Sequence, residues 1–134
     1  MLVRVSLAVR LRTALQAHPG VTLALLFGSR AAGRPRPDSD VDLAVRAHRV
    51  DLLALASRLS LELGVEVDVV DLEAAGYPLL SRIVEQGVVV AERRPGAAAL
   101  WRAHAILSLE TDRPWYARMR DAYLARLAGA KPSW

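Results

Sequence analysis

The sequence of 134 residues lacks cysteine. This absence excludes disulfides, thiolate metal ligands and catalysis by a thiol. It also lacks an apolar run of about 20 residues, the length needed to cross a bilayer, and its first 20 residues show no signal-peptide core. Aromatic residues make up only 5% of the chain, which argues against a base-stacking surface for nucleic acid. We therefore expect a cytoplasmic protein that contacts no membrane.

The remaining composition is that of one folded domain. Hydrophobic residues make up 53% and charged residues 24% of the chain, which excludes a disordered protein. A chain of this length buries roughly two-thirds of its unfolded surface in a single core. The net charge is +4, and every basic residue except Lys131 is an arginine. The arginines are scattered apart from Arg30, Arg34 and Arg36, so we expect these three to serve nucleotide phosphates rather than nucleic acid.

Hydrophobic periodicity predicts an alternation of helices and strands. It indicates helices over residues 4–17, 51–63 and 77–86, strands over 21–27, 41–46, 65–70 and 88–91, a loop over 28–38, and a helical segment from residue 96 interrupted at Pro114. This order predicts an α/β (α+β) fold, with a small mixed sheet, helices packed on one side and C-terminal helices. We expect a core domain over residues 1–92 and a helical extension over 93–134 in the same compact unit.

Alternation along two of these strands places three carboxylates on one face. In strand 41–46 the apolar residues face the helices, so Asp40 and Asp42 face away from them. The same reasoning for strand 65–70 points Asp68 away from the helices, beside the first pair. Asp71 lies three positions after Asp68, so its side chain points to the opposite face of the sheet. Parity therefore selects Asp68, and not Asp71, as the third member of the cluster.

Such a cluster needs a cation. Two unit negative charges about 6 Å apart repel by roughly 2 to 3 kcal/mol at an effective dielectric near 20. A proton or a divalent cation relieves this repulsion, and Mg²⁺ prefers carboxylates, waters and substrate phosphates as ligands. We expect Asp40, Asp42 and Asp68 to bridge two Mg²⁺ ions to a nucleoside triphosphate.

The Gly28–Ser29 pair, which follows strand 21–27, fits a phosphate. Gly28 has no Cβ and lets the backbone turn sharply and approach a ligand, and Ser29 adds a hydroxyl and a main-chain N–H. Taken singly, Gly-Ser is a common turn and Asp-x-Asp is a solvated strand start. Their joint spacing, with ten residues between them, arises by chance in a chain of this length with a probability on the order of 10⁻³ at average residue usage.

Residues 26–33 and 39–43 closely resemble the signature of the minimal nucleotidyltransferases (MNT) in the DNA polymerase beta superfamily, and residues 67–72 look like the third acidic strand of that family. The resemblance covers about residues 1–92. It implies two Mg²⁺ ions and transfer of a nucleoside monophosphate to a hydroxyl. By motif it assigns Gly28 and Ser29 to the triphosphate, beside Arg30, and it assigns Asp40, Asp42 and Asp68 to metal. Asp68 is also the candidate to accept the proton of the attacking hydroxyl.

The tail, residues 97–134, is similar to the C-terminal helices of MntA-type antitoxins. In that group the nucleotidyltransferase pairs with a HEPN-domain ribonuclease toxin and attaches AMP to a tyrosine of the toxin. Trp115, Met119, Tyr123 and either Arg126 or Leu127 follow helical spacing. This stripe either packs on its own domain or docks a partner.

Three functions follow as hypotheses. The first is Mg²⁺-dependent transfer of AMP from ATP to a protein hydroxyl, such as a tyrosine of a HEPN ribonuclease toxin, by an antitoxin. The second is a non-catalytic binding module that neutralises its partner by occlusion. The third is a small-molecule nucleotidyltransferase of the aminoglycoside type. The choice of adenine comes from the resemblance alone.

Overall fold

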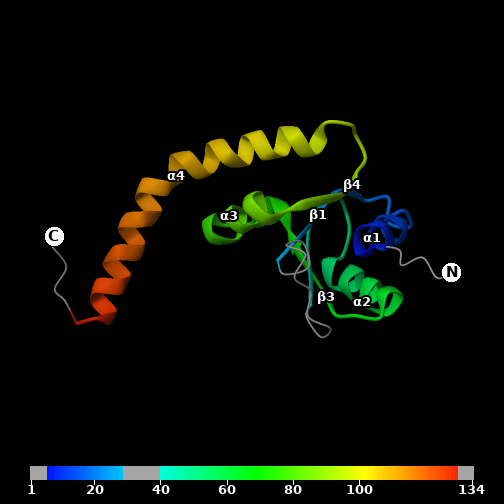
Figure 1. Ribbon diagram of the computed structural model, residues 1–134, viewed down its shortest axis with the longest axis horizontal. Helices are drawn as coiled ribbons and strands as arrows, with labels where there is room; N and C mark the ends of the chain where they lie inside the picture. Colours follow the sequence, from blue (N-terminus) through cyan, green and yellow to red (C-terminus); the bar gives the residue numbers. More distant parts are fainter. Residues whose placement is uncertain (1–5, 29–39, 130–134) are drawn as a thin grey trace.

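The computed structural model describes residues 6–28 and 40–129 (Figure 1). The elements run in the order α1 (Leu7–Leu15), β1 (Val21–Phe27), β2 (Val41–Ala47), α2 (Leu52–Leu63), β3 (Val67–Asp71), a 3₁₀ turn η1 (Leu72–Ala74), α3 (Tyr77–Gln86), β4 (Val88–Glu92) and α4 (Ala97–Leu127). The strands form one sheet in the order β3-β2-β1-β4. β1 is antiparallel to β2 and β4, and β2 is parallel to β3. The predicted mixed α/β sheet is confirmed.

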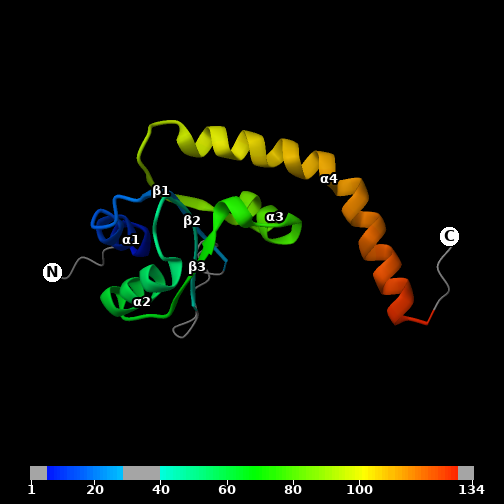
Figure 2. The ribbon, with the colours of Figure 1, turned by 180° about the vertical axis from the view of Figure 1, so that it is seen from behind.

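Helices cover both faces of this sheet, each over its own core. Figures 1 and 2 show α1 and α2 on one side of the strands and α3 and α4 on the other. The first core joins side chains of α1 and α2 to Val41, Leu43 and Val45 of β2. The second joins α3 and α4 to Leu23, Leu25 and Phe27 of β1. The prediction of helices on one side was therefore wrong, because β1 is apolar on both faces and both need a cover.

Most element boundaries agree with the sequence signals. β1 and α3 have their predicted bounds, β2 and β4 are each one residue longer than predicted, and β3 begins at Val67 and ends at Asp71. α2 begins after Asp51, whose carboxylate accepts the N–H groups of Leu53 and Ala54. It ends at Gly64 in the left-handed conformation, with φ 69°, as is common at helix C-termini. Residues 4 and 5 of the first predicted helix, and the predicted loop from residue 29 onward, lie outside the described residues.

α4 is one helix of 31 residues that runs through Pro114, where an interruption was expected. It bends along its orange part in Figure 1, as expected where proline removes a backbone donor and crowds the preceding turn. Before the bend, Trp101, Ala105 and Leu109 are buried in the second core. Just after it, the ring of Tyr116 stacks on that of Tyr77, with centroids 4.4 Å apart. The C-terminal segment is thus a single bent helix rather than several helices.

Beyond this stacking contact, α4 extends away from the sheet (Figures 1 and 2). Its large side chains there are exposed: Trp115 is 58%, Met119 53%, Tyr123 60% and Leu127 66% accessible. We call these four residues the α4 stripe. None of the helices in the described ranges is both long enough and apolar enough to cross a bilayer.

Candidate functional site

The parallel pairing of β2 with β3 brings two of the predicted carboxylates together. In this register Asp42 lies opposite Asp68, and Val45 lies opposite Asp71. The prediction that Asp68 is the neighbour of Asp42 is confirmed. The prediction that both face away from the helices was wrong, because α3 and α4 cover the face of the sheet to which these two positions belong. Asp71 has a local task instead: its carboxylate accepts the N–H of Glu73 at 2.9 Å and begins the 3₁₀ turn.

Asp42 lies where the second core meets solvent. Its neighbours Val41 and Leu43 are fully buried in the first core, whereas Asp42 points to the face that carries Ala44, a residue of the second core. Asp42 is half-buried, and Asp40 and Asp68 are exposed. β2 therefore carries a partly desolvated carboxylate at its start, flanked by two carboxylates that water and ligands can reach.

This placement disfavours the charged form of Asp42. Burial raises the pKa of the Asp42 carboxyl above its ordinary value, and the negative charge of Asp68 raises it further. The guanidinium of Arg82 lowers this pKa, and Asp40 raises it. A bound cation would relieve the same repulsion that the proton relieves.

The donor set fits a hard divalent cation. Mg²⁺ is commonly held by one or two carboxylates together with substrate phosphates, and the Asp42–Asp68 pair supplies carboxylate oxygens with excess negative charge. Over residues 6–28 and 40–129, no three His, Cys, Asp or Glu side chains gather as a ready-made metal cage. The protein side of the site is thus the adjacent pair, with Asp40 next to it in sequence.

Gly28 connects the two halves of the motif. It follows β1 with φ 81°, and a Cβ at this position would lie 2.5 Å from Oδ2 of Asp42. Any larger residue would have to displace this carboxylate and adopt a strained backbone. The predicted nucleotide-binding residues Ser29 and Arg30 lie outside the described residues. Gly28 and Asp42, which are 14 positions apart in the sequence, are therefore packed directly against each other.

Two residues of α3, Arg82 and Gln86, reach this site and were missed by the sequence reasoning. Oε1 of Gln86 accepts the N–H of Gly28 at 3.2 Å. The guanidinium carbon of Arg82 lies 5.6 Å from the ring centroid of Phe27. Arg82 and Gln86 are four residues apart, which places them on one face of a helix. This spacing could have indicated from the sequence that the two residues act at the same place.

A pocket of about 450 Å³ opens beside the carboxylates. It is lined on one side by Asp42, Asp68 and Arg82, and otherwise by Phe27, Leu52, Leu53, Ala56, Val69, Val70 and Leu79. Because β3 is an edge strand, the pocket runs along an edge of the sheet. It combines an apolar wall, two carboxylates and one guanidinium.

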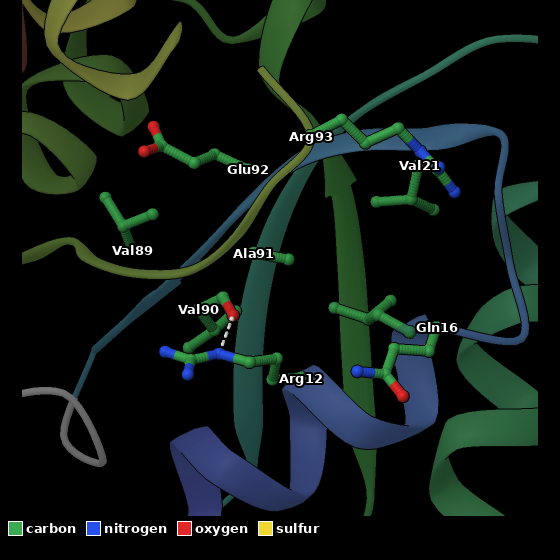
Figure 3. A pocket seen from close by; sticks show the side chains of 9 residues that line it. Arg12, Gln16, Val21, Val89, Val90, Ala91, Glu92 and Arg93 are labelled. Atoms are coloured by element: carbon green, nitrogen blue, oxygen red, sulfur yellow. Dashed lines mark hydrogen bonds between the residues drawn. The ribbon is translucent and has the colours of Figure 1, made fainter. Parts of the chain in front are cut away.

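A second pocket, of about 490 Å³, lies between α1 and β4. Figure 3 shows Arg12 donating through Nε to the carbonyl of Val90, at 3.2 Å, across this pocket. Its lining also includes aliphatic side chains and the polar or charged side chains of Gln16, Glu92 and Arg93. Because β4 and β3 are opposite edges of the sheet, this pocket is separate from the carboxylate pair.

The sequence matches one family model, described as polymerase beta, nucleotidyltransferase, over residues 10–95. The chain is also similar to the protein adenylyltransferase MntA of Shewanella oneidensis, with 40% identity over 73 residues. These residues cover 52% of this chain and 52% of MntA. The chain thus spans about half the length of the curated relative that it matches.

Solved structures of toxin–antitoxin complexes share the fold. A chain in the crystal structure of a toxin–antitoxin with AMP-PNP is 27% identical, with a TM-score of 0.73 over 87% of this chain and 98% of that one. A chain in the complex of tri-AMPylated Shewanella oneidensis HEPN toxin with MNT antitoxin is 25% identical. It has a TM-score of 0.66 over 87% of this chain and 95% of that chain.

Proposed function

Because the chain belongs to the polymerase beta nucleotidyltransferase family, we propose that it transfers AMP from ATP to a hydroxyl of a partner protein, with Mg²⁺, as the antitoxin of a toxin–antitoxin pair. The observation that carries this proposal is the packing of Gly28 against Asp42, with Asp68 beside Asp42 on the next strand. It supports the proposal because a glycine turn can approach a phosphate closely and a carboxylate pair can hold a cation.

Each residue of the site has a role in the proposed transfer. Asp42 and Asp68, with Asp40, would hold two Mg²⁺ ions, and Gly28, Ser29 and Arg30 would hold the triphosphate. Bound Mg²⁺ neutralises phosphate charge and makes the α-phosphorus more electrophilic.

In the transfer itself, the hydroxyl oxygen of the acceptor bonds to the α-phosphorus. The bond from that phosphorus to the oxygen that bridges it to the β-phosphorus breaks, and pyrophosphate leaves with the electron pair. Asp68, whose carboxylate is exposed, accepts the hydroxyl proton.

The proposed acceptor is a tyrosine of a HEPN-family ribonuclease toxin. Support comes from the relative named protein adenylyltransferase MntA and from the similar chain in a complex with a tri-AMPylated HEPN toxin. The α4 stripe is the surface on which we expect this partner to dock, because a row of exposed large apolar side chains favours protein association.

A second candidate function is neutralisation by occlusion alone, without catalysis. The exposed α4 stripe favours it, since a docking surface could block a partner without help from the carboxylates. In that case the Asp42–Asp68 pair would be unnecessary for neutralisation, and this difference separates the two functions.

The test uses the full chain, radiolabelled ATP, Mg²⁺ and the product of the neighbouring gene, which the proposal expects to be a HEPN protein. We expect label on the HEPN protein, lost at least about a hundredfold in Asp42→Ala and retained in Glu62→Ala, which removes an exposed carboxylate of α2. Full neutralisation of the HEPN ribonuclease by Asp42→Ala would instead support occlusion. AMP transfer to an aminoglycoside without any protein acceptor would support a small-molecule enzyme.

A further inference from the structure

The carboxylate pocket would have to accept a ligand whose charge has the same sign as that of its carboxylates. A nucleoside triphosphate carries several negative charges, and Asp42 and Asp68 add two more on the wall that it would approach. These carboxylates would hold metal ions, and the motif assigns Arg30 to the triphosphate; a further cation at the pocket would stabilise the outer phosphates.

Arg82 is placed to be that cation. Among the described residues that line the pocket, it alone carries a positive charge. Its side chain is exposed, so a ligand can reach the guanidinium. The ring of Phe27 lies 5.6 Å from the guanidinium carbon, a range in which a cation and an aromatic face attract each other. This contact restrains the side chain without using its N–H donors.

The position of α3 brings Arg82 toward the glycine turn as well as the carboxylates. One turn further along α3, Gln86 accepts the N–H of Gly28 and ties the helix to this turn. Phe27, which lies under Arg82, is the residue directly before Gly28. The guanidinium thus lies over the ring of the residue that precedes the glycine turn, and it lines the same pocket as Asp42 and Asp68.

We propose that Arg82 binds the β- and γ-phosphates of the nucleoside triphosphate and so holds the pyrophosphate that leaves in the transfer. The inference rests on the proposed function and adds to it a residue that the motif does not contain. A planar guanidinium presents paired N–H donors that match two phosphate oxygens.

Binding of two nucleotides to the full chain tests this role without measuring activity. The probes are the α,β-methylene analogue of ATP, whose α–β linkage does not break, and AMP, which lacks the β- and γ-phosphates. NMR titration in the presence of Mg²⁺ detects the weak binding expected for AMP, and isothermal titration calorimetry measures tighter binding of the ATP analogue. We expect Arg82→Gln to weaken binding of the ATP analogue about tenfold to a hundredfold and to change AMP binding by less than about twofold.

Two further variants make the result specific. Arg82→Lys keeps the charge but loses the paired donors, so we expect an affinity for the analogue between those of the wild type and Arg82→Gln. Arg102→Gln removes an exposed arginine of α4 outside the pocket and should bind both probes as the wild type does. Circular dichroism checks that each variant is folded. If Arg82→Gln does not fold, the comparison of Arg82→Lys with the wild type provides the test.

The outcomes separate this inference from the function on which it rests. If the wild type binds the analogue and Arg82→Gln binds it equally well, the role of Arg82 is overturned and the proposed function stands. An equal loss of affinity for AMP and for the analogue also overturns it, because the contact is then not with the outer phosphates. If the wild type itself does not bind the analogue, this result contradicts the proposed function and, with it, the proposed role of Arg82.

Discussion

The carboxylate edge of the sheet and the outer half of α4 differ in how much of their surface the domain itself uses. At the edge, Asp42 fills the space in which a Cβ of Gly28 would lie, 2.5 Å from that position, and Gln86 holds the backbone of the same glycine. On α4, Trp115 and Tyr123 have more than half of their surface in solvent, although side chains of their size are usually largely buried.

Under the proposed function, the sheet edge carries out the chemistry and the outer half of α4 recognises the partner. Phosphoryl transfer depends on the position of charged groups to a fraction of an ångström, so its groups belong on paired strands. A docking surface needs exposed apolar area that only a partner covers. If this division is correct, substitutions in one region should leave the function of the other region unchanged.

The largest expected effect is at the edge, in a comparison of Asp68→Asn with Asp71→Asn. Asp68 lies opposite Asp42, whereas Asp71 caps a 3₁₀ turn. We expect Asp68→Asn to lower the rate of AMP transfer in single turnovers at least about a hundredfold, because the proposed function assigns Asp68 both a metal ion and the proton of the attacking hydroxyl. Asp71→Asn should keep the rate within about threefold of the wild type and affect mainly stability or affinity.

Both variants should still bind the proposed HEPN partner with the affinity of the wild type, since neither changes α4. A larger loss of rate in Asp71→Asn than in Asp68→Asn would contradict the assignment of Asp68. Loss of partner binding in Asp68→Asn would contradict the division into two regions.

The carboxylate edge was largely predictable because strand parity is a local property. Val41 and Leu43 fix which side of β2 faces the first core, and Asp42 follows from them. The pairing with Asp68 needed only the further assumption that β3 lies next to β2. The contacts of α3 could not be predicted in this way, because Arg82 and Gln86 reach the site only through the path of α3 across the opposite face.

The prediction that helices cover only one face of the sheet was wrong for a related reason. β2 alternates between apolar residues and a face that reads Asp42, Ala44, Arg46, which suggests solvent on that side. Ala44 is nevertheless fully buried in the second core, since a small side chain lets a covering helix approach closely. The apolar residues of β1 on both faces were the better guide.

Hydrophobic periodicity predicts only part of what the structure shows for α4. Its spacing predicted an apolar stripe but not whether the domain or a partner covers it. Pro114 does not end the helix, because it lies on the exposed part of α4, where water can satisfy the carbonyl that loses its partner.

The second prediction concerns this stripe. Trp115→Ser combined with Tyr123→Ser should weaken association with the proposed HEPN partner about a hundredfold, because large aromatic side chains dominate protein interfaces. Isothermal titration calorimetry measures the association, and binding of the ATP analogue by the same variant should be unchanged. The melting temperature of the variant should equal that of the wild type, since both residues are exposed in the free chain.

Glu110→Ser combined with Asp121→Ser provides the control on the same helix. Both acids are exposed, and helical geometry at 100° per residue places them on the side opposite to the stripe. This variant should bind the partner nearly as the wild type does. Equal weakening by both pairs, or by neither, would show that the stripe is not the docking surface.

The smallest expected effect is a gain in stability from Asp42→Asn. Burial and the neighbouring carboxylate raise the pKa of Asp42 in the folded protein above its unfolded value. The folded state therefore binds this proton more tightly than the unfolded state does, and that stabilisation is present at a pH below the unfolded pKa. It is lost as the pH rises from the unfolded pKa through the raised folded pKa, so at pH 7 the charged carboxylate destabilises the fold.

Thermal unfolding in EDTA, followed by circular dichroism, measures this effect. Asp42→Asn should melt higher than the wild type at pH 7 by no more than a few degrees, because water screens a half-exposed charge. The difference should shrink as the pH falls below about 4, near the ordinary pKa of aspartate. Adding Mg²⁺ should then stabilise the wild type more than the variant, because the cation relieves in the wild type the repulsion that asparagine has already removed. An Asp42→Asn protein that is less stable than the wild type at pH 7 in EDTA would show that the carboxylate supports the fold, and the tight packing at this edge would then have a structural rather than a chemical cause.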